Sequence, residues 1–308
     1  MPTEMSIPDH YQVKYGDMFE SKLQQKQNRL AKYVTIKNNL AGRYGTIEQI
    51  DPIELDEKTT RFGKTVLEDV VTSRRFIFPQ TFEKAVGFDE DDGWKLNQLS
   101  VPIMESATQL YQGAQRRMEK IIIDQVDGTN TIGNGQDEAQ TTVVLPAAQI
   151  VDVDYVETGS TANSDLTIGK LRRALQILQE AEAFGQDAEE DTTACCALSA
   201  KQLNSLLRTT ELTSSDFSQV KALVHGEIDT AFGFMFVRTE QLNVASNIRN
   251  VLCWAKTKVC FGIWDNYRSR LSIRDDLSEA TQYRVKFSAG ATRKEEKGVV
   301  RILCDETV

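Results

Sequence analysis

The sequence contains few of the residues from which catalytic and metal sites are built. Its 308 residues include only two histidines, His10 and His225, and these form no HxxxH or HxH pair. The chain has neither a GxxxxGK[ST] loop nor a GxGxxG segment for nucleotide phosphates, and no GxSxG turn for a nucleophilic serine. These absences argue against histidine-bound metals, nucleotide cofactors and serine hydrolysis. We expect no catalytic, cofactor-binding or metal-binding residue, and no enzyme activity.

Cysteine is also scarce, and its spacing fits no zinc motif. The five cysteines are Cys195, Cys196, Cys253, Cys260 and Cys304. Cys195 and Cys196 are adjacent within the apolar run TTACCALS, so on a strand their side chains would point to opposite faces. We expect these cysteines to be buried free thiols.

The chain lacks any apolar run close to the roughly 20 residues needed to cross a bilayer. Its N-terminus shows no basic region followed by an apolar one, which predicts synthesis and folding in a cytoplasm. The formal net charge is -9. Lysines and arginines are scattered, and the RR pairs fall in separate elements, so the sequence predicts no tight grip on nucleic acid.

Carboxylates are the remaining candidates for catalysis, because they occur in runs. These runs are residues 89–92, 189–191 and 275–276. Acid–base catalysis needs two carboxylates in one cleft with shifted pKa values, whereas consecutive acids in polar loops are usually solvated. Asp124 and Asp127 lie one turn apart before Gly128, and we interpret them as a helix end and not as a metal pair.

The strongest helical pattern covers residues 100–126. Ser100 is a suitable N-cap residue, Pro102 is favoured in the first turn, and Gly128 is favoured just after the C-terminal end of a helix. Apolar residues recur at three- and four-residue steps, and Arg116, Glu119 and their charged neighbours are expected on the opposite side. The helix would be about 40 Å long, which suggests a spine spanning the molecule. Shorter helices are expected at residues 167–184 and 201–207.

Strand patterns fill much of the remaining sequence. Two β-leaning runs with partial alternation predict a long hairpin over residues 43–73, with neither face apolar enough for a core. Such a hairpin is a poor element for a monomer and a plausible arm onto a neighbour. Residues 129–135 are expected to be a loop, and TQYRVKFSAG and GVVRILC are expected to pair across the turn ATRKEEKG. Helices and strands mix without βαβ alternation, so the predicted class is α+β.

Several segments resemble one family closely. They are VKALVHGEIDTAFGFMFVRTEQL at 220–242, RRFIFPQTFEKAVGFDEDDGWKL at 74–96, LQQKQNRL at 23–30 and LSAKQLNSLL at 198–207. Their order and spacing resemble the tailed-phage major capsid proteins that share the Hong Kong ninety-seven capsid fold. The resemblance covers nearly the whole chain beyond the first dozen residues.

The resemblance implies an architecture of named parts. Residues 1–40 would be an N-terminal arm, 41–73 the extended loop formed by the β-hairpin, and 74–156 a peripheral domain with the spine helix at 100–126. Residues 157–265 would be an axial domain whose tip lies near 241–249, and 266–308 would return as strands to the peripheral domain. No motif marks a lysine–asparagine cross-link, so none is assigned to Lys58 or Lys64.

The resemblance also implies a function. The chain would self-assemble as pentamers and hexamers into the icosahedral head shell around the double-stranded DNA of a tailed phage, first in the host cytoplasm and then in the virion. A separate scaffolding protein and a portal are the expected partners, and the sequence leaves open whether a decoration protein is present. DNA contact would be weak and non-specific, with no membrane and no cofactor. The alternatives are an encapsulin-type cellular compartment and, more remotely, a hydrolase using acidic loops.

Overall fold

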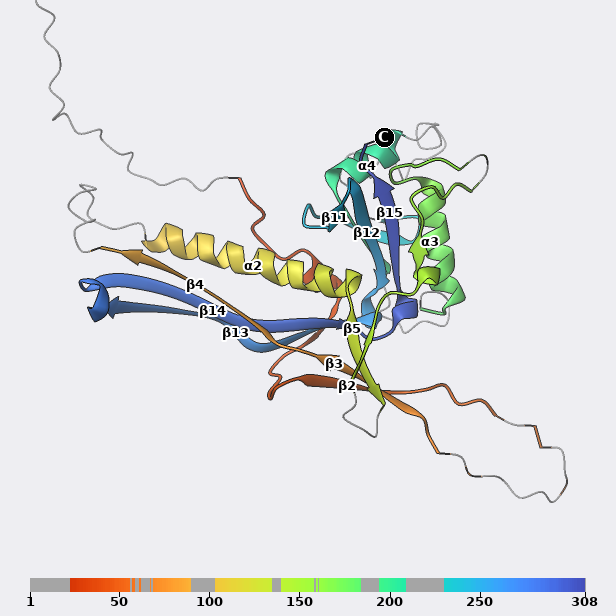
Figure 1. Ribbon diagram of the computed structural model, residues 1–308, viewed down its shortest axis with the longest axis horizontal. Helices are drawn as coiled ribbons and strands as arrows, with labels where there is room; N and C mark the ends of the chain where they lie inside the picture. The colour runs from red at the N-terminus through yellow and green to blue at the C-terminus, as the bar shows by residue number, and fades with distance from the viewer. Residues whose placement is uncertain are drawn as a thin grey trace, which may run out of the picture.

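The computed structural model describes residues 23–55, 57–58, 61, 67, 69–89, 103–134, 140–157, 159, 161–183, 194–208 and 230–307. Both histidines and the first 22 residues lie outside these ranges, so expectations about them are untested. The described chain forms an elongated body with a compact lobe at one end and a hairpin that projects from the junction of the two (Figure 1).

The elongated body is a long helix lying on a sheet. The helix α2 (Ile103–Asp127) packs on a four-stranded sheet of order β1-β13-β14-β4. The strands are β1 (Thr35–Lys37), β13 (Val259–Arg274), β14 (Ala280–Arg293) and β4 (Gln80–Phe88). The 3₁₀ turns η1 (Leu30–Tyr33), η3 (Lys256–Lys258), η4 (Asp275–Leu277) and η5 (Glu296–Gly298) lie at strand ends.

The compact lobe is built on a larger sheet of order β7-β15-β12-β8-β10-β9, with β11 paired to β12. Its strands are β7 (Ile150–Val151), β15 (Val299–Asp305), β12 (Ile248–Ala255), β8 (Ala194–Leu198), β10 (Phe234–Arg238), β9 (Thr230–Ala231) and β11 (Val244–Ala245). The helices α3 (Ile168–Glu180) and α4 (Ala200–Arg208) and the turn η2 (Ala147–Gln149) complete the lobe. The α+β class is confirmed.

A third, smaller sheet of order β2-β3-β5-β6 forms the foot of the projecting hairpin. Its strands are β2 (Gly45–Ile50), β3 (Thr72–Ile77), β5 (Asn130–Asn134) and β6 (Thr141–Val143). The prediction that residues 129–135 form a loop is wrong, because β5 pairs with β3 and β6. The pairing is long-range, and the glycines on either side of Asn134 made this segment look like a turn.

The predicted pairing across ATRKEEKG is also wrong. β14 pairs with β13 and β4, whereas β15 pairs with β12 and β7. The chain does not reverse at η5. It continues from β14 into β15, alongside the continuation from β12 through η3 into β13. The reversal comes at η4, where Ser278 and Glu279 adopt positive φ. This long antiparallel ribbon therefore joins the two main sheets.

The ribbon also crosses the domain division expected from the resemblance. The expected boundary between residues 265 and 266 falls inside β13, and β15 belongs to the same sheet as β12 and β8. Within the expected return segment 266–308, β14 therefore lies on the elongated body, while β15 lies in the compact lobe.

Burial across the larger sheet follows strand alternation. On β8, Cys196 faces a core formed with α3, and Cys195 faces a core formed with α2. All five cysteines are buried and free, as expected. Trp254 is fully buried, and its indole Nε1 donates to the Tyr33 carbonyl at 2.8 Å. Trp264 is only partly buried, against the small cluster around Ile77.

The buried thiols predict a loss of stability at alkaline pH. Burial raises the pKa of Cys195, Cys196 and Cys304 above the ordinary value of 9.0. An unfolded thiol deprotonates near pH 9 while the folded thiol stays protonated, so the thiols' contribution is present below pH 9 and lost above it. We expect the free energy of unfolding to fall by up to about 1.4 kcal/mol per pH unit for each thiol.

Urea unfolding between pH 8 and 10.5 measures this loss, and the variant Cys195→Ala is the control. The variant is less stable because it lacks buried atoms, but its free energy of unfolding should fall less steeply with pH. Equal slopes for the two proteins would contradict the assignment to the thiols.

A buried arginine from β14 caps the C-terminal end of the spine helix. Gly128 closes the last turn, since its N–H donates to the Asp124 carbonyl at 2.8 Å. The fully buried Arg293 of β14 donates to the carbonyls of Val126 at 2.9 Å and Gly128 at 2.6 Å. A cation suits the negative end of a helix dipole. Burial lowers the pKa of Arg293 to about 10, so the group still carries its charge at neutral pH.

Candidate intersubunit surfaces

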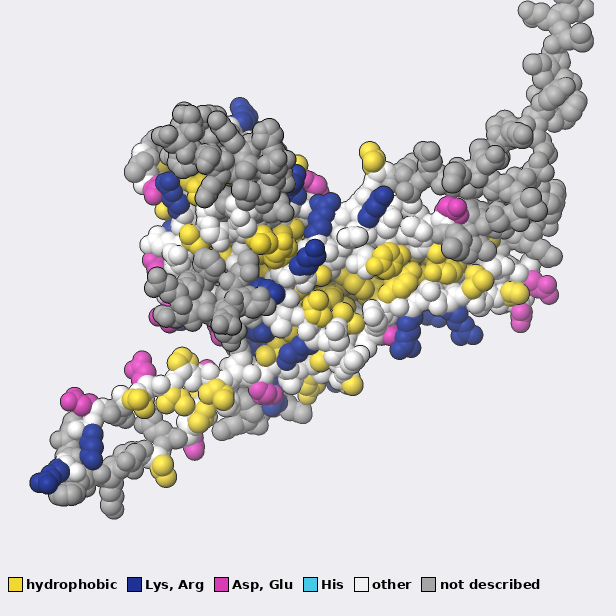
Figure 2. Space-filling model, turned by 180° about the vertical axis from the view of Figure 1, so that it is seen from behind, with side chains coloured by type: hydrophobic (Ala, Val, Ile, Leu, Met, Phe, Trp, Pro, Cys, Tyr) yellow, Lys and Arg dark blue, Asp and Glu magenta, His cyan; other side chains and the backbone are white. Residues whose placement is uncertain are grey.

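The projecting hairpin has an ordered foot and an apolar shaft. β2 and β3 pair from Gly45↔Ile77 to Ile50↔Thr72. Beyond them, Ile53, Leu55 and Leu67 are 70%, 97% and 95% exposed. Hydrophobic side chains gather along this projection (Figure 2). Exposed apolar side chains that gather on one projection are typical of a surface that binds a partner.

The N-terminal arm, where it is described, is bound to its own subunit. Leu30 and Val34 are buried in the core that α2 forms. The side chains of Gln24 and Gln25 hydrogen bond to side chains of α2, so this polar segment lies along the spine helix. The arm then continues as β1, which pairs with β13 in parallel.

The carboxylate of Glu119 joins the arm, the spine helix and the compact lobe. It accepts hydrogen bonds from Gln25 Nε2 at 2.6 Å, from the Arg29 N–H at 2.8 Å and from Thr239 Oγ1 at 2.6 Å. Glu119 is fully buried, so its placement on the exposed side of the helix was wrong. The one available signal was its spacing, because the apolar residues Ile122 and Ile123 follow it at the three- and four-residue steps that share a helix face.

A second carboxylate fixes the tip of the compact lobe. Asp127 accepts from Asn243 Nδ2 at 2.8 Å and Asn250 Nδ2 at 2.9 Å, and it forms an ion pair with Arg301 at 3.0 Å. The Asp127 carboxylate is therefore bound by these three side chains. Asp124 forms an ion pair with Lys120 and does not join Asp127 in a shared site. Over the described ranges, no group of three or more His, Cys, Asp or Glu side chains could hold a metal ion.

The tip itself is the β11–β12 hairpin. Val244 and Ala245 pair with Arg249 and Ile248, and the turn residues Ser246 and Asn247 both have positive φ. Such a two-residue turn matches the twist of the flanking strands. Val244 is 47% exposed, so the tip presents an apolar side chain to its surroundings.

Two further charged groups, Lys170 and Asp276, likewise have structural partners. The fully buried Lys170 donates through Nζ to the carbonyls of Val153, Ser164 and Leu303, and burial lowers its pKa. Of the acidic runs, residues 90–92 and 189–191 lie outside the described chain. Arg274 holds the pKa of the exposed Asp276 below its ordinary value through a direct hydrogen bond.

These features define an architecture for assembly: a projecting apolar hairpin, an arm laid along a spine helix, and a lobe with an exposed tip. A family model for phage capsid proteins matches residues 7–306. The chain belongs to this family. It is a major capsid protein, a structural protein of the virion that assembles with other copies into a shell.

Solved structures show the same fold at low sequence identity. The capsid of Ralstonia phage GP4 matches with a TM-score of 0.69 and 12% identity, covering 99% of this chain and 98% of that one. The capsid of cyanophage P-SCSP1u matches with a TM-score of 0.69 and 14% identity, covering 96% and 93%. No curated protein sequence matches the chain significantly.

The encapsulin alternative has weaker structural support. An encapsulin complex from Synechococcus elongatus matches with a TM-score of 0.57 and 10% identity, covering 94% of this chain and 91% of that one. The two phage capsids therefore superpose better on this chain than this encapsulin does. No helix among the described residues is both long and apolar enough to span a membrane.

Proposed function

We propose that the subunits form pentamers and hexamers that close into an icosahedral head shell around double-stranded DNA, and that the protein has no enzymatic activity. The projecting hairpin carries this proposal, because its exposed apolar shaft is accounted for when it packs on a neighbouring subunit. Shell contacts are many and individually modest, so their sum closes the particle.

In this proposal, each part expected from the resemblance has its own role in the shell. The hairpin over residues 41–73 extends to a neighbour, α2 and the four-stranded sheet form the peripheral domain, and the lobe with α3 and α4 forms the axial domain. The tip near residues 241–249 surrounds the capsomer axis. Assembly depends on a separate scaffolding protein, and the head also contains a portal.

Self-assembly is the direct consequence of this proposal. We expect the expressed protein, alone or with its scaffolding protein, to elute from a size-exclusion column as very large particles. Negative-stain microscopy of the same fractions should show closed shells. A hydrolase would instead remain a monomer or a small oligomer. A protein that stays strictly monomeric at high concentration with its scaffold would contradict the proposal.

Contact with the packaged DNA is expected to be weak and dependent on salt. The subunit carries a net charge of -9, and the sequence has no basic stripe to contact six to ten phosphates. Packaging then relies on a motor and on shell closure. Binding of duplex DNA at near-physiological salt measures this, and a dissociation constant in the nanomolar range would be contrary to the prediction.

A further inference from the structure

A groove lies between the spine helix α2 and the strands β4 and β14. Its volume is about 300 Å³, which is within the range of natural binding pockets. Val285 and Phe287 of β14 pair with Lys84 and Phe82 of β4, so these four side chains share one face of the sheet. Phe82 and Leu110 are only half-buried. The groove therefore has an apolar floor that stays partly open, formed by Phe82, Leu110, Gly113, Ala114, Val285 and Phe287.

The rim of this groove is basic. The Arg117 guanidinium lies 4.4 Å from the centroid of the Phe82 ring. Arg116 also reaches over the groove, since its Nη2 lies 3.7 Å from where a Cβ on Gly113 would be. With Lys84, three cations line the groove, and none of them forms an ion pair with a carboxylate of the described chain. The acidic lining residue, Glu83, alternates to the other face of β4 and pairs there with Arg284.

The described arm begins at this rim. Gln24 donates through Nε2 to Gln109 Oε1, and Arg116 donates to Gln24 Oε1. Arg116 also donates to the Gln25 carbonyl at 3.0 Å. Both Gln109 and Arg116 line the groove. Leu23, the first described residue, is fully exposed. The preceding residues of the chain therefore connect to the structure at the edge of the groove.

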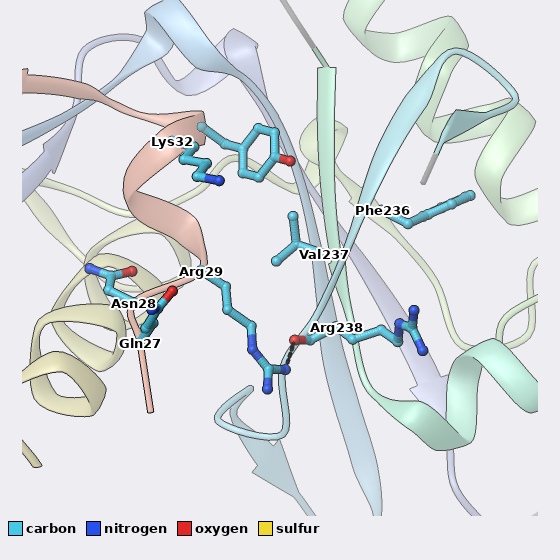
Figure 3. Close-up of a pocket in the computed structure, with 8 residues that line it drawn as sticks. Gln27, Asn28, Arg29, Lys32, Phe236, Val237 and Arg238 are labelled. Atoms are coloured by element: carbon cyan, nitrogen blue, oxygen red, sulfur yellow. Dashed lines mark hydrogen bonds between the residues drawn. The ribbon is translucent and has the colours of Figure 1, made fainter. Parts of the chain in front are cut away.

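The arm is also held at a second point, further along the chain. The Arg29 guanidinium donates to the Arg238 carbonyl of β10, beside a cavity of about 480 Å³ (Figure 3). Two anchors, at Gln24 and at Arg29, thus fix the arm on its own subunit. They fix the place from which residues 1–22 extend.

The sequence just before Leu23 has the composition that the groove fits. Residues 17–20 are DMFE, two apolar side chains flanked by two carboxylates. Phe19 is five residues before Gln24, so an extended chain spans at most about 17 Å between them. The groove covers the helix from Gln109 to Arg116, which is about 10 Å at the rise of an α-helix. Residues 17–20 are therefore within reach of the whole groove.

We propose that residues 17–20 dock in this groove of their own chain, with Met18 and Phe19 on the apolar floor and Asp17 and Glu20 at the basic rim. The floor supplies the burial that an exposed aromatic side chain gains, and the three cations supply charge complementarity. The short tether from Gln24 makes the binding intramolecular, with an effective concentration in the millimolar range. A segment from another chain would have to compete with this local copy.

Disulfide trapping in the full-length protein tests the docking. The variant Phe19→Cys with Gly113→Cys places one thiol on each partner. Gly113 accepts the change, because the nearest atom to an added Cβ is Arg116 Nη2 at an ordinary contact distance. The five native cysteines are buried and should stay unreactive while the protein is folded. Under a mild copper–phenanthroline oxidant, we expect the engineered pair to form a disulfide within one chain, seen as a monomer band on a non-reducing gel.

The matched control is Ile7→Cys with Gly113→Cys, which places the first thiol at an apolar position outside residues 17–20. The Phe19 pair should cross-link at least about tenfold faster than this control. Equal rates for the two pairs would overturn the docking. A dimer band would assign the segment to a neighbouring chain and would overturn the own-chain assignment.

Limited proteolysis gives a second readout without engineered thiols. Phe19→Asp removes the apolar anchor, and Leu110→Glu places a carboxylate on the floor of the groove. We expect each change to speed tryptic cleavage after Lys22 at least about tenfold, whereas Ile7→Asp should leave the rate unchanged. Circular dichroism checks the fold of each variant.

Phe19→Asp changes no residue of the described chain, so this test stands even if Leu110→Glu does not fold. A cleavage rate equal to wild type in folded Phe19→Asp would contradict the docking. Both measurements concern contacts within one chain, so their outcome is separate from whether the subunits close into a shell.

Discussion

Deleting residues 58–63 is expected to leave the subunit folded and to abolish closed shells. The foot of the hairpin is held by β2, β3 and β5, none of which includes these residues. The shaft that carries Ile53, Leu55 and Leu67 would be shortened at its end, so its contact with a neighbour would be lost. Burying one such apolar side chain stabilises a contact by about 1.5–3 kcal/mol, repeated at every subunit of the shell.

Far-ultraviolet circular dichroism and thermal melting should give the same fold for the deletion variant as for wild type, while electron microscopy should find no closed shells. The variant Lys58→Gln keeps the hairpin length, serves as the control and should assemble. Normal particles from the deletion variant would show that the hairpin is not an intersubunit arm.

Replacing Glu119 is expected to cause a large loss of stability. In Glu119→Ala, the donors of Gln25, Arg29 and Thr239 lose their shared acceptor inside the protein. Breaking buried, charged hydrogen bonds in this way costs about 3–5 kcal/mol. The arm should also detach from α2 and become sensitive to proteases.

Urea unfolding and limited proteolysis measure the two effects. Glu119→Gln keeps the size of the side chain but has only one acceptor oxygen, so it should lose less stability than Glu119→Ala. Glu105→Ala, at an exposed position of the same helix, should change the free energy of unfolding by less than about 0.5 kcal/mol. If Glu119→Ala is as stable as that control, Glu119 does not hold the arm.

Local sequence patterns predicted the helices and strands whose formation depends mainly on neighbouring residues. The spine helix was expected at residues 100–126 and is described over Ile103–Asp127. The opposite orientations of Cys195 and Cys196 were predicted from strand alternation and confirmed. The hairpin foot was predicted from two β-leaning runs of mixed polarity.

Long-range pairing and buried charge were not predictable in the same way. The run ATRKEEKG is charged and carries a glycine, so it looked like a hairpin turn, although the chain keeps its direction there. Glu119, Lys170 and Arg293 are fully buried because distant backbone and side-chain groups complete their hydrogen bonds. No spacing rule places such partners together, so charged side chains were expected on the surface.

The candidate intersubunit surfaces also fall into those that the sequence could predict and those that it could not. The resemblance to capsid proteins was enough to indicate the hairpin, the arm and the axial tip. The cavity where the arm meets β10 and the cavity between the hairpin foot, the end of α3 and η5 could not be predicted, because each combines residues from segments far apart in the sequence. Arg29 meets Arg238 across 209 positions, and Asp51 lines a cavity with Glu182 and Glu296.

Cryo-electron microscopy of purified assemblies tests the central claim most directly. We expect closed icosahedral particles in which this chain forms both five- and six-membered rings, with residues 41–73 of each subunit lying on a neighbour. Assemblies limited to monomers or small open oligomers, under conditions where the scaffolding protein is present, would contradict the assignment of this chain as the shell subunit.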